Sequence, residues 1–211
     1  MTDAATVHIV DDDTSLREAL GSLLRSVGIE TRGYESVAAF LAGGPTDRAG
    51  CLLLDVRLPG TSGLDFQEQL EGLGILLPVV FMTGHGDIPM SVRAMKAGAV
   101  DFLPKPFRDQ DLLDAVSGAI ERDRRQRAER AEIAGLAERF GTLSPREREV
   151  MSLVTAGRLN KQVAGDLGLS EITVKIHRGS AMRKMGAQSL ADLVRMSEAL
   201  GVVAPERRHR A

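Results

Sequence analysis

The sequence contains one cysteine, Cys51, among its 211 residues. An intrachain disulfide bond therefore cannot form, which excludes a small secreted fold held together by disulfide bridges. The sequence also lacks any run close to the roughly 18 apolar residues that a membrane-spanning helix needs. Its N-terminal segment MTDAATVHIV does not show the basic and apolar regions of a secretion signal. We expect a cytoplasmic protein that does not enter a membrane.

Glycine-rich phosphate-binding loops are absent as well. Neither GxxxxGKS/T nor GxGxxG follows a predicted strand, which argues against nucleotide-dependent chemistry. Low-complexity segments and internal sequence repeats are also lacking. The proportions of hydrophobic residues, 43%, and charged residues, 27%, are those of a folded globular protein.

The net charge of −2 hides two halves of opposite sign. Residues 1–120 hold 17 acidic and 9 basic side chains, a net charge of −8, whereas residues 121–211 hold 12 acidic and 18 basic side chains, a net charge of +6. A basic surface attracts the phosphate backbone of nucleic acid and an acidic surface repels it. Because the length also suits one larger and one smaller domain, we predict two domains, of which the second can bind nucleic acid.

Short apolar segments alternate with longer segments of helical periodicity in the acidic half. The predicted strands are residues 7–10, 29–34, 51–55, 78–83 and 100–103, and the predicted helices are residues 14–27, 36–42, 63–73, 87–97 and 109 onward. This alternation is typical of a parallel sheet that helices cover on both faces. We therefore predict a five-stranded, doubly wound α/β fold of the flavodoxin-like type, with binding residues at the carboxyl ends of its strands.

The basic half is organised differently. Residues 122–141 are rich in Arg, Glu and Ala and contain no proline, which predicts a long, solvated helical linker. The pattern after the linker is helical only, and four short helices are expected near residues 145–155, 160–167, 171–185 and 189–200. The predicted organisation is thus an α/β domain at 1–121, the linker, and a small all-α domain at 142–211.

Local signals mark the ends of these helices. Ser144 is a capping residue, Pro145 suits the first helical position, and Glu147 completes a capping box three residues after the serine. Between the second and third helices, Gly168 and Ser170 frame a tight turn, with the glycine ending one helix and the serine capping the next. This spacing is typical of a helix-turn-helix.

Carboxylates follow two of the predicted strands. Asp11 and Asp12 come directly after the first strand, and Asp55 ends the third. Carboxylates brought together at one sheet edge repel each other unless a cation is present, and oxygen ligands of this kind suit Mg²⁺. Thr83 ends the fourth strand and Lys105 follows the fifth, so a hydroxyl group and a positive charge are available for phosphoryl oxygens. The set predicts a site for metal-assisted phosphoryl chemistry.

The segments IVDDD, LLLDVRLPG, FMTGHGD and DFLPKPF resemble the receiver domain of two-component response regulators over residues 5–121. The resemblance implies that Asp55 accepts the phosphoryl group. It also implies that Asp12, Asp55 and the backbone carbonyl of Arg57 bind Mg²⁺ directly, and that Asp11 helps through water.

The same resemblance assigns roles around the phosphoryl group. Thr83 and Lys105 would bind its oxygens, and Phe102 matches an aromatic switch position that turns inward when the threonine moves. Phenylalanine stands there instead of the equally familiar tyrosine, which removes a hydroxyl group and keeps the packing. His85, two positions after the threonine, is a candidate to influence hydrolysis of the phosphoryl group. The Lys105-Pro106 peptide bond is a candidate for the cis form.

Three residues have more ordinary interpretations. Asp13 is as well suited to cap a helix as to join the acidic pocket. His8 lies inside a strand and is expected to be packed there. Cys51 has apolar neighbours and is expected in the core.

The C-terminal segment resembles the LuxR-type helix-turn-helix of the NarL/FixJ family across residues 142–200, with LSPRE and LSEITVKIH as its most specific marks. The resemblance implies that helix 171–185 enters the major groove of DNA and that Lys175 and Ile176 contact bases. Gly179 occupies a position where some relatives carry a basic residue, so the resemblance does not supply a third base contact. Further candidate contacts to bases or backbone are Thr173, His177 and Arg178, and candidate phosphate contacts are Asn160, Lys161 and Arg183.

Together the two resemblances imply a transcription regulator rather than an enzyme. A sensor histidine kinase would phosphorylate Asp55, the protein would dimerise through helix 87–97 and strand 100–103, and the dimer would bind double-stranded promoter DNA and act on RNA polymerase.

Two alternatives remain open on the residues alone. One is a Mg²⁺-dependent phosphatase or phosphotransferase that uses Asp55 as a nucleophile on small substrates. The other is a regulator that partner binding controls without phosphorylation. The basic helical half argues against the first alternative, and the complete set of pocket residues argues against the second.

Overall fold

The structure is a computed structural model that describes residues 5–45, 47–84 and 88–202. The chain divides into two compact units, Met1–Arg127 and Ala128–Ala211. Among the residues that the structure describes, buried hydrophobic side chains form two cores in the first unit and one in the second. The division falls inside segment 122–141, for which the sequence predicts a linker.

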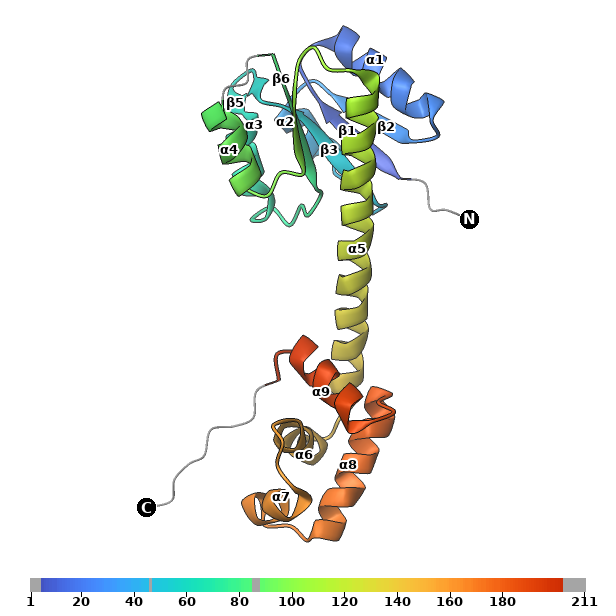
Figure 1. Cartoon of the computed structure of the whole chain (residues 1–211), viewed down its shortest axis with the longest axis vertical. Helices are drawn as coiled ribbons and strands as arrows, with labels where there is room; N and C mark the ends of the chain where they lie inside the picture. Colours follow the sequence, from blue (N-terminus) through green and yellow to red (C-terminus); the bar gives the residue numbers. More distant parts are fainter. Residues whose placement is uncertain (1–4, 46, 85–87, 203–211) are drawn as a thin grey trace. The chain divides into compact units, whose positions relative to one another are not determined.

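A five-stranded parallel sheet forms the centre of the first unit (Figure 1). In spatial order its strands are β2 (Glu30–Tyr34), β1 (Thr6–Val10), β3 (Gly50–Asp55), β6 (Val79–Thr83) and β7 (Asp101–Pro104). Counted along the chain, this order is second, first, third, fourth and fifth, as in flavodoxin-like folds. The predicted fold class is confirmed, and all five predicted strands are present within a residue or two of their expected bounds.

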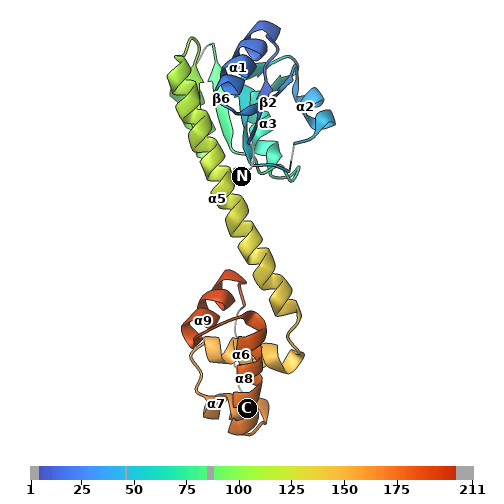
Figure 2. The same cartoon turned by 90° about the vertical axis from the view of Figure 1, so that its right-hand side faces the viewer.

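Helices cover both faces of this sheet (Figures 1 and 2). On one face lie α1 (Thr14–Ser26) and the N-terminal part of α5 (Asp109–Gly141). On the other face lie α2 (Val37–Gly43), α3 (Gly63–Leu70) and α4 (Ile88–Lys96). The sheet is therefore buried on both sides, which explains why its central strands are almost continuously apolar.

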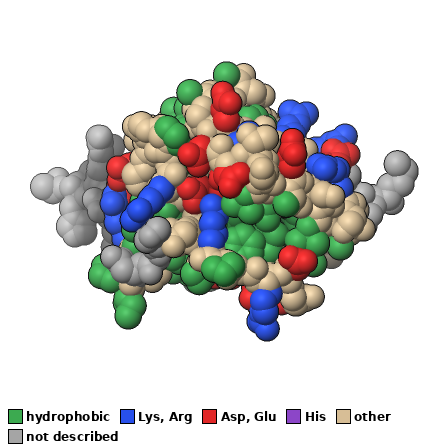
Figure 3. Space-filling model, turned by 90° about the horizontal axis from the view of Figure 1, so that it is seen from above, with side chains coloured by type: hydrophobic (Ala, Val, Ile, Leu, Met, Phe, Trp, Pro, Cys, Tyr) green, Lys and Arg blue, Asp and Glu red, His purple; other side chains and the backbone are tan. Residues whose placement is uncertain are grey.

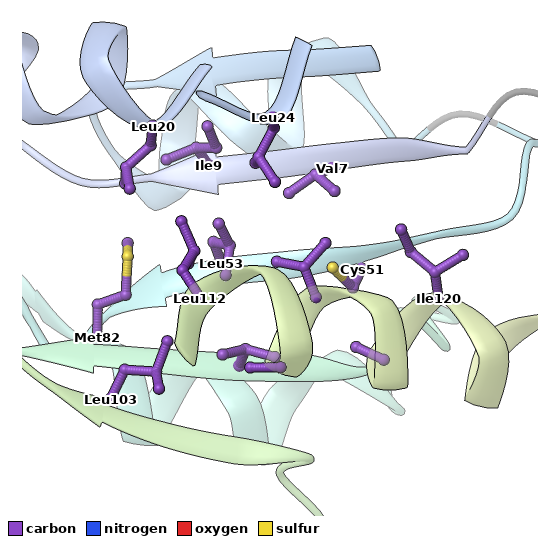
Figure 4. Packing of buried hydrophobic residues seen from close by; sticks show 14 of the residues in the cluster. Val7, Ile9, Leu20, Leu24, Cys51, Leu53, Met82, Leu103, Leu112 and Ile120 are labelled. Carbon is purple, nitrogen blue, oxygen red and sulfur yellow. The ribbon is translucent and has the colours of Figure 1, made fainter. Parts of the chain in front are cut away.

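Successive side chains of β3 enter two different cores, because neighbouring residues of a strand point to opposite faces. Cys51 and Leu53 belong to the core under α1 and α5, whereas Leu52 and Leu54 belong to the core under α2, α3 and α4. Figure 4 shows Leu53 facing Leu112 of α5. Cys51 is fully buried, as expected from its neighbours, and burial raises the pKa of its thiol.

A hairpin of two short strands, which the sequence analysis did not anticipate, follows β3. β4 (Arg57–Leu58) pairs antiparallel with β5 (Thr61–Ser62). The turn between them is Pro59-Gly60, and Gly60 has a φ of 79°. Proline followed by a glycine with positive φ is the signature of a type II turn, so the signal was present in the sequence.

Two predicted helices are shorter than expected. The helix predicted at 63–73 ends at Leu70, and Gly74 beyond it has a φ of 71°. The helix predicted at 87–97 ends at Lys96 and is followed by Gly98 with a φ of 90°. Glycines with positive φ commonly end helices. The expected first residue, 87, lies outside the described residues.

The helix α5 has 33 residues and includes the whole predicted linker. Its continuation past the sheet is held by Asp123, whose buried carboxylate accepts hydrogen bonds from the backbone N–H of Gly50 at 2.9 Å and from Arg127 Nε at 2.7 Å. Among the described residues, no helix combines the length and apolar character that a membrane span requires.

Four helices make up most of the second unit. They are α6 (Pro145–Thr155), α7 (Asn160–Leu167), α8 (Glu171–Met185) and α9 (Leu190–Ala199). The first three coincide with the predicted ranges, because their end signals are local. Ser144 forms the capping box, Gly168 ends α7 with a φ of 65°, and the Ser170 side chain accepts a hydrogen bond from the N–H of Thr173 at 3.1 Å.

Two glycine-to-alanine substitutions should change the stability of the first unit in opposite directions. A Cβ atom on Gly50 would lie 2.0 Å from the carbonyl oxygen of Thr6 in the neighbouring strand, so Gly50→Ala should lower the free energy of unfolding by about 1 to 3 kcal/mol. Gly118 is exposed within α5 and a Cβ there meets nothing within 4 Å, so Gly118→Ala should raise the free energy by roughly 0.5 to 1 kcal/mol.

Urea unfolding followed by tyrosine fluorescence measures both effects. The chain has one tyrosine and no tryptophan, and Tyr34 lies in β2, so the signal comes from the first unit. If the two substitutions changed the free energy of unfolding equally, the result would contradict the close approach of β1 to Gly50.

Candidate functional site

The carboxyl ends of four strands bring together the predicted pocket residues. Asp11 follows β1, Asp55 ends β3, Thr83 ends β6 and Lys105 follows β7. One carboxylate oxygen from each of Asp11, Asp12 and Asp55 lies within 4.8 Å of the others. Figure 3 shows acidic side chains gathered on this face of the first unit, with a basic side chain and an apolar patch beside them.

Lys105 connects two of these carboxylates. Its Nζ atom donates hydrogen bonds to Asp11 Oδ2 at 2.7 Å and to Asp55 Oδ1 at 3.1 Å. Burial raises the pKa of Asp55, the hydrogen bond from Lys105 partly counteracts this, and the negative charge of Asp11 adds to the increase. Burial alone would lower the pKa of Lys105, but its hydrogen bonds to Asp11 and Asp55 raise the pKa above its ordinary value. The lysine therefore stays charged between the two acids.

The remaining pocket residues are positioned by the backbone. Thr83 is 1% exposed, and its carbonyl oxygen accepts a hydrogen bond from the N–H of Lys105 at 2.6 Å. The Lys105-Pro106 peptide bond is cis. Phe102 in β7 is half-buried, and its ring centroid lies 6.3 Å from that of Phe81. The backbone of Arg57 forms a hydrogen bond with the Asp55 carboxylate.

Asp13 caps a helix and is not part of the acidic cluster. Its side chain accepts a hydrogen bond from the N–H of Leu16 at 3.1 Å at the start of α1. Its own N–H donates to Asp11 Oδ1 at 2.9 Å. Of the two interpretations left open by the sequence, the capping one describes the structure.

Two residues that support the pocket were missed in the sequence. Arg17 donates a hydrogen bond to the carbonyl oxygen of Asp11 at 2.6 Å, and a Cβ on Gly63 would lie 2.3 Å from the carbonyl oxygen of Asp55. The glycine lets α3 begin against the end of β3, so it helps to fix the position of Asp55. Neither contact has a local sequence signal, because each depends on how separate elements pack.

Two histidines of the first unit were singled out in the sequence. His8 is fully buried, as expected, and its Nδ1 atom lies 3.1 Å from the hydroxyl oxygen of Tyr34. Burial, assisted by the charge of Arg32, lowers the pKa of His8 to about 4. His85 lies outside the described residues.

The acidic cluster fits a magnesium ion by its chemistry. Its three carboxylates offer only oxygen atoms, which Mg²⁺ prefers, and they converge within 4.8 Å. Two of them are buried and Asp12 is exposed, so a bound ion would keep access to water and to a phosphate oxygen. Burial raises the pKa of Asp55, whereas a cation bound at this point would favour the ionised form of the carboxylate.

The second candidate site is the exposed face of α8. Lys175, Ile176 and Arg183 are exposed on this face, whereas Val174 and Met185 belong to the core on the opposite side. The predicted contact residues at the edges of α8 are Thr173, His177 and Arg178, all half-buried. From α7, Lys161 is exposed and Asn160 is half-buried at the first helical position.

An ion pair holds α8 in place. Lys184 Nζ donates to Glu147 Oε2 at 2.7 Å, and the same carboxylate oxygen accepts the N–H of Ser144 at 2.7 Å. These contacts lower the pKa of Glu147 to about 2, with the hydrogen bond from Lys184 as the largest cause. The sequence analysis recognised Glu147 only as part of a capping box and missed its contact with Lys184 of α8.

Two family models match the chain. The response regulator receiver domain matches residues 7–117, and the luxR family of bacterial regulatory proteins matches residues 141–197. The chain belongs to the response regulator family. Both predicted resemblances are confirmed. The combination of a receiver and a luxR-family DNA-binding domain identifies the chain as a transcription regulator rather than an enzyme, and phosphorylation-dependent regulation is the norm in this family.

Curated relatives of this response regulator match along almost their whole length. Nodulation protein W of Bradyrhizobium diazoefficiens is 59% identical over 95% of this chain and 88% of its own. The transcriptional regulatory protein FixJ of Rhizobium meliloti is 45% identical over 95% of this chain and 98% of its own.

Solved structures of this family match as well. The response regulator StyR has a TM-score of 0.79 with 47% identity, over 92% of this chain and 98% of its own. Full-length FixJ from B. japonicum has a TM-score of 0.57 with 37% identity, over 96% of this chain and 100% of its own. A receiver joined to a LuxR-type domain implies a sensor kinase as partner and DNA as ligand.

The depressed pKa of Glu147 predicts a pH-dependent contribution to stability. Its carboxylate stabilises the folded second unit above its ordinary pKa of 4.5, and this contribution is lost as the pH falls from there through about 2. Glu147→Gln should therefore lower the free energy of unfolding by about 1 to 2 kcal/mol at pH 7, with a smaller loss near pH 3.

Hydrogen exchange of the amides of α6 and α8 measures this loss. The matched control is Glu149→Gln, because Glu149 forms a surface ion pair with Arg146 at 2.7 Å and is about half exposed. The control should change stability by less than about 0.5 kcal/mol. A loss with Glu147→Gln that is as large at pH 3 as at pH 7 would contradict the assigned ion pair.

Proposed function

We propose that this response regulator binds promoter DNA under the control of phosphorylation at Asp55. The observation that carries the proposal is the position of the Asp55 carboxylate, at the end of β3, with Lys105 Nζ 3.1 Å away and two more carboxylates within 4.8 Å. The expected donor is a phosphohistidine of a sensor histidine kinase. An oxygen of Asp55 attacks the phosphorus, a P–O bond forms as the P–N bond breaks, and the histidine nitrogen leaves with the electron pair and takes up a proton.

The other pocket residues have distinct roles in this proposal. Asp11, Asp12, Asp55 and the backbone carbonyl of Arg57 would hold Mg²⁺, which when bound supplies positive charge to the phosphoryl oxygens. Lys105 exchanges its hydrogen bond with Asp55 for one with a phosphoryl oxygen. The hydroxyl group of Thr83 donates a hydrogen bond to another phosphoryl oxygen.

Movement of Thr83 changes the surface of the receiver. Phe102 is half-buried in the neighbouring strand β7, so space that opens near the threonine lets its ring turn inward. The segments affected are the predicted dimer surface, helix 87–97 and strand 100–103. Within them α4 exposes Ile88 at 79%, Val92 at 43% and Met95 at 47%. An apolar surface of this kind supports pairing with a second copy of the chain.

The receiver offers a docking surface for the kinase beside the pocket. The groove between α1 and the segment after β7 has a volume of about 640 Å³ and is lined by six apolar residues and two charged ones: Leu16, Ala19, Leu20, Leu23, Pro106, Phe107, Lys105 and Asp109. Its apolar lining supports a helix of the kinase that presents the phosphohistidine to Asp55.

The dimer would then bind DNA through its LuxR-type domains. Lys175 and Ile176 contact bases, and Asn160, Lys161 and Arg183 contact phosphates, with Thr173, His177 and Arg178 at the edges of the interface. Two recognition helices lie on half-sites about one helical turn apart, and the bound dimer acts on RNA polymerase.

In this proposal residues 1–121 are the receiver, 122–141 the linker and 142–211 the DNA-binding domain. The protein works in the cytoplasm, where promoters are accessible.

Intact-mass spectrometry tests the phosphoryl chemistry. Incubation with acetyl phosphate and Mg²⁺ should add one phosphoryl group per chain, and the gain should disappear without Mg²⁺ and in Asp55→Asn. A folded protein that gains no phosphoryl group would favour control by partner binding alone. Repeated turnover of a small phosphorylated substrate would instead favour an enzyme.

Phosphorylation should strengthen both dimerisation and DNA binding. Ile88→Asp places a charge on the exposed face of α4 and should weaken DNA binding of the phosphorylated protein about tenfold or more, because the two domains no longer bind as a pair. Leu41→Asp is the matched control, since Leu41 is 42% exposed on α2, outside the dimer surface. Analytical ultracentrifugation and gel shifts measure the two quantities. Unchanged dimerisation and DNA affinity on phosphorylation would refute the coupling.

A further inference from the structure

The recognition helix α8 exposes two isoleucines. Ile172 is 71% exposed and Ile176 is 64% exposed. Ile176 already has a predicted base contact, but Ile172 has no assigned role. Of the large hydrophobic side chains described as exposed in the second unit, Ile172 is the most exposed. Its position at the start of α8 therefore needs an explanation other than core packing.

Ile172 shares one face of α8 with the residues expected to meet DNA. Positions three, four, seven and eleven residues after it lie on the same side of a helix, and they hold Lys175, Ile176, Gly179 and Arg183. The buried residues Val174, Ala181 and Met185 lie on the opposite side. Ile172 thus lies on the outward face of a helix that the core already orients.

The charges around this face indicate what covers it. Lys175 and Arg183 on the face, and Lys161 on the neighbouring helix, are exposed cations, so the occupant is a polyanion. An isoleucine cannot bind phosphate. In the major groove of DNA the apolar group open to contact is the 5-methyl group of thymine. An isoleucine one turn from Lys175 on this face fits a thymine within a phosphate-lined groove.

Gly179 leaves room for such a contact. It lies two turns after Ile172 on the same face, and a Cβ built on it meets nothing within 4 Å. Without a side chain there, the middle of α8 can come closer to the base edges, which brings a short aliphatic side chain within reach of a methyl group.

We propose that Ile172 is a specificity-determining residue that packs against the 5-methyl group of a thymine in each operator half-site. This inference rests on the proposed DNA-binding function. It adds a base contact that the family resemblance does not supply and assigns it a base.

The test removes the methyl group from the DNA and the side chain from the protein. An operator is first selected from random duplexes with the full-length phosphorylated protein. Each recurring thymine of a half-site is then replaced by uracil, which lacks only the methyl group. For the wild-type protein, one replacement should weaken binding roughly fourfold per half-site, the effect of exposing about one methyl group.

The protein variants assign this loss to Ile172. Ile172→Ala should bind the thymine and uracil operators equally, whereas Ile172→Val, which keeps a branched side chain, should retain most of the preference for thymine. Leu159→Ala is the matched control, because Leu159 is 69% exposed at the N-cap of α7, outside this face. It should keep the full preference. The salt dependence of binding should be the same for Ile172→Ala and the wild type, since no phosphate contact is lost.

Three results would overturn the inference while leaving the proposed function intact. They are an operator without a recurring thymine, wild-type binding that uracil does not weaken at any position, and a uracil penalty that persists in Ile172→Ala. If the full-length protein, phosphorylated or not, selects no DNA sequence, the proposed function itself fails.

Discussion

A lysine between two buried carboxylates is the interaction on which the first unit depends. The core aligns β1 and β3 so that Asp11 and Asp55 end at the same sheet edge, and their charges would repel each other there. Lys105 offsets this repulsion through hydrogen bonds of 2.7 and 3.1 Å. A single ammonium group therefore compensates the negative charges of two carboxylates. In the proposed function, a phosphoryl group or a metal ion would change this balance of charges.

The second unit also contains an ion pair between a lysine and a buried carboxylate. Lys184, on α8, is bound by Glu147 of α6, and the buried residues Val174, Ala181 and Met185 hold the same helix from behind. Together they fix which side of α8 faces outward. The exposed cations and isoleucines owe their direction to this core, so the surface that α8 offers to a ligand is a consequence of packing as much as of surface chemistry.

Much of the fold followed from the sequence because its signals are local. Strands buried on both faces appear as apolar runs, and Ser144, Gly168 and Ser170 mark helix ends by their own hydrogen bonds and dihedral angles, so α6, α7 and α8 coincide with the predicted ranges. The same strand ends predicted which pocket residues would converge. The contacts of Arg17 with Asp11 and of Gly63 with Asp55 were not predictable, because they depend on how α1 and α3 pack against the sheet.

The burial of Cys51 has a practical consequence. It is the chain's one cysteine, its side chain is fully enclosed in the sheet core, and burial disfavours its reactive thiolate form. Thiol-directed reagents therefore have no accessible native target in the folded protein. A cysteine introduced on the surface of each unit would carry a spin label or fluorophore without background, so the distance between receiver and DNA-binding unit becomes measurable through a complete cycle of phosphorylation and hydrolysis.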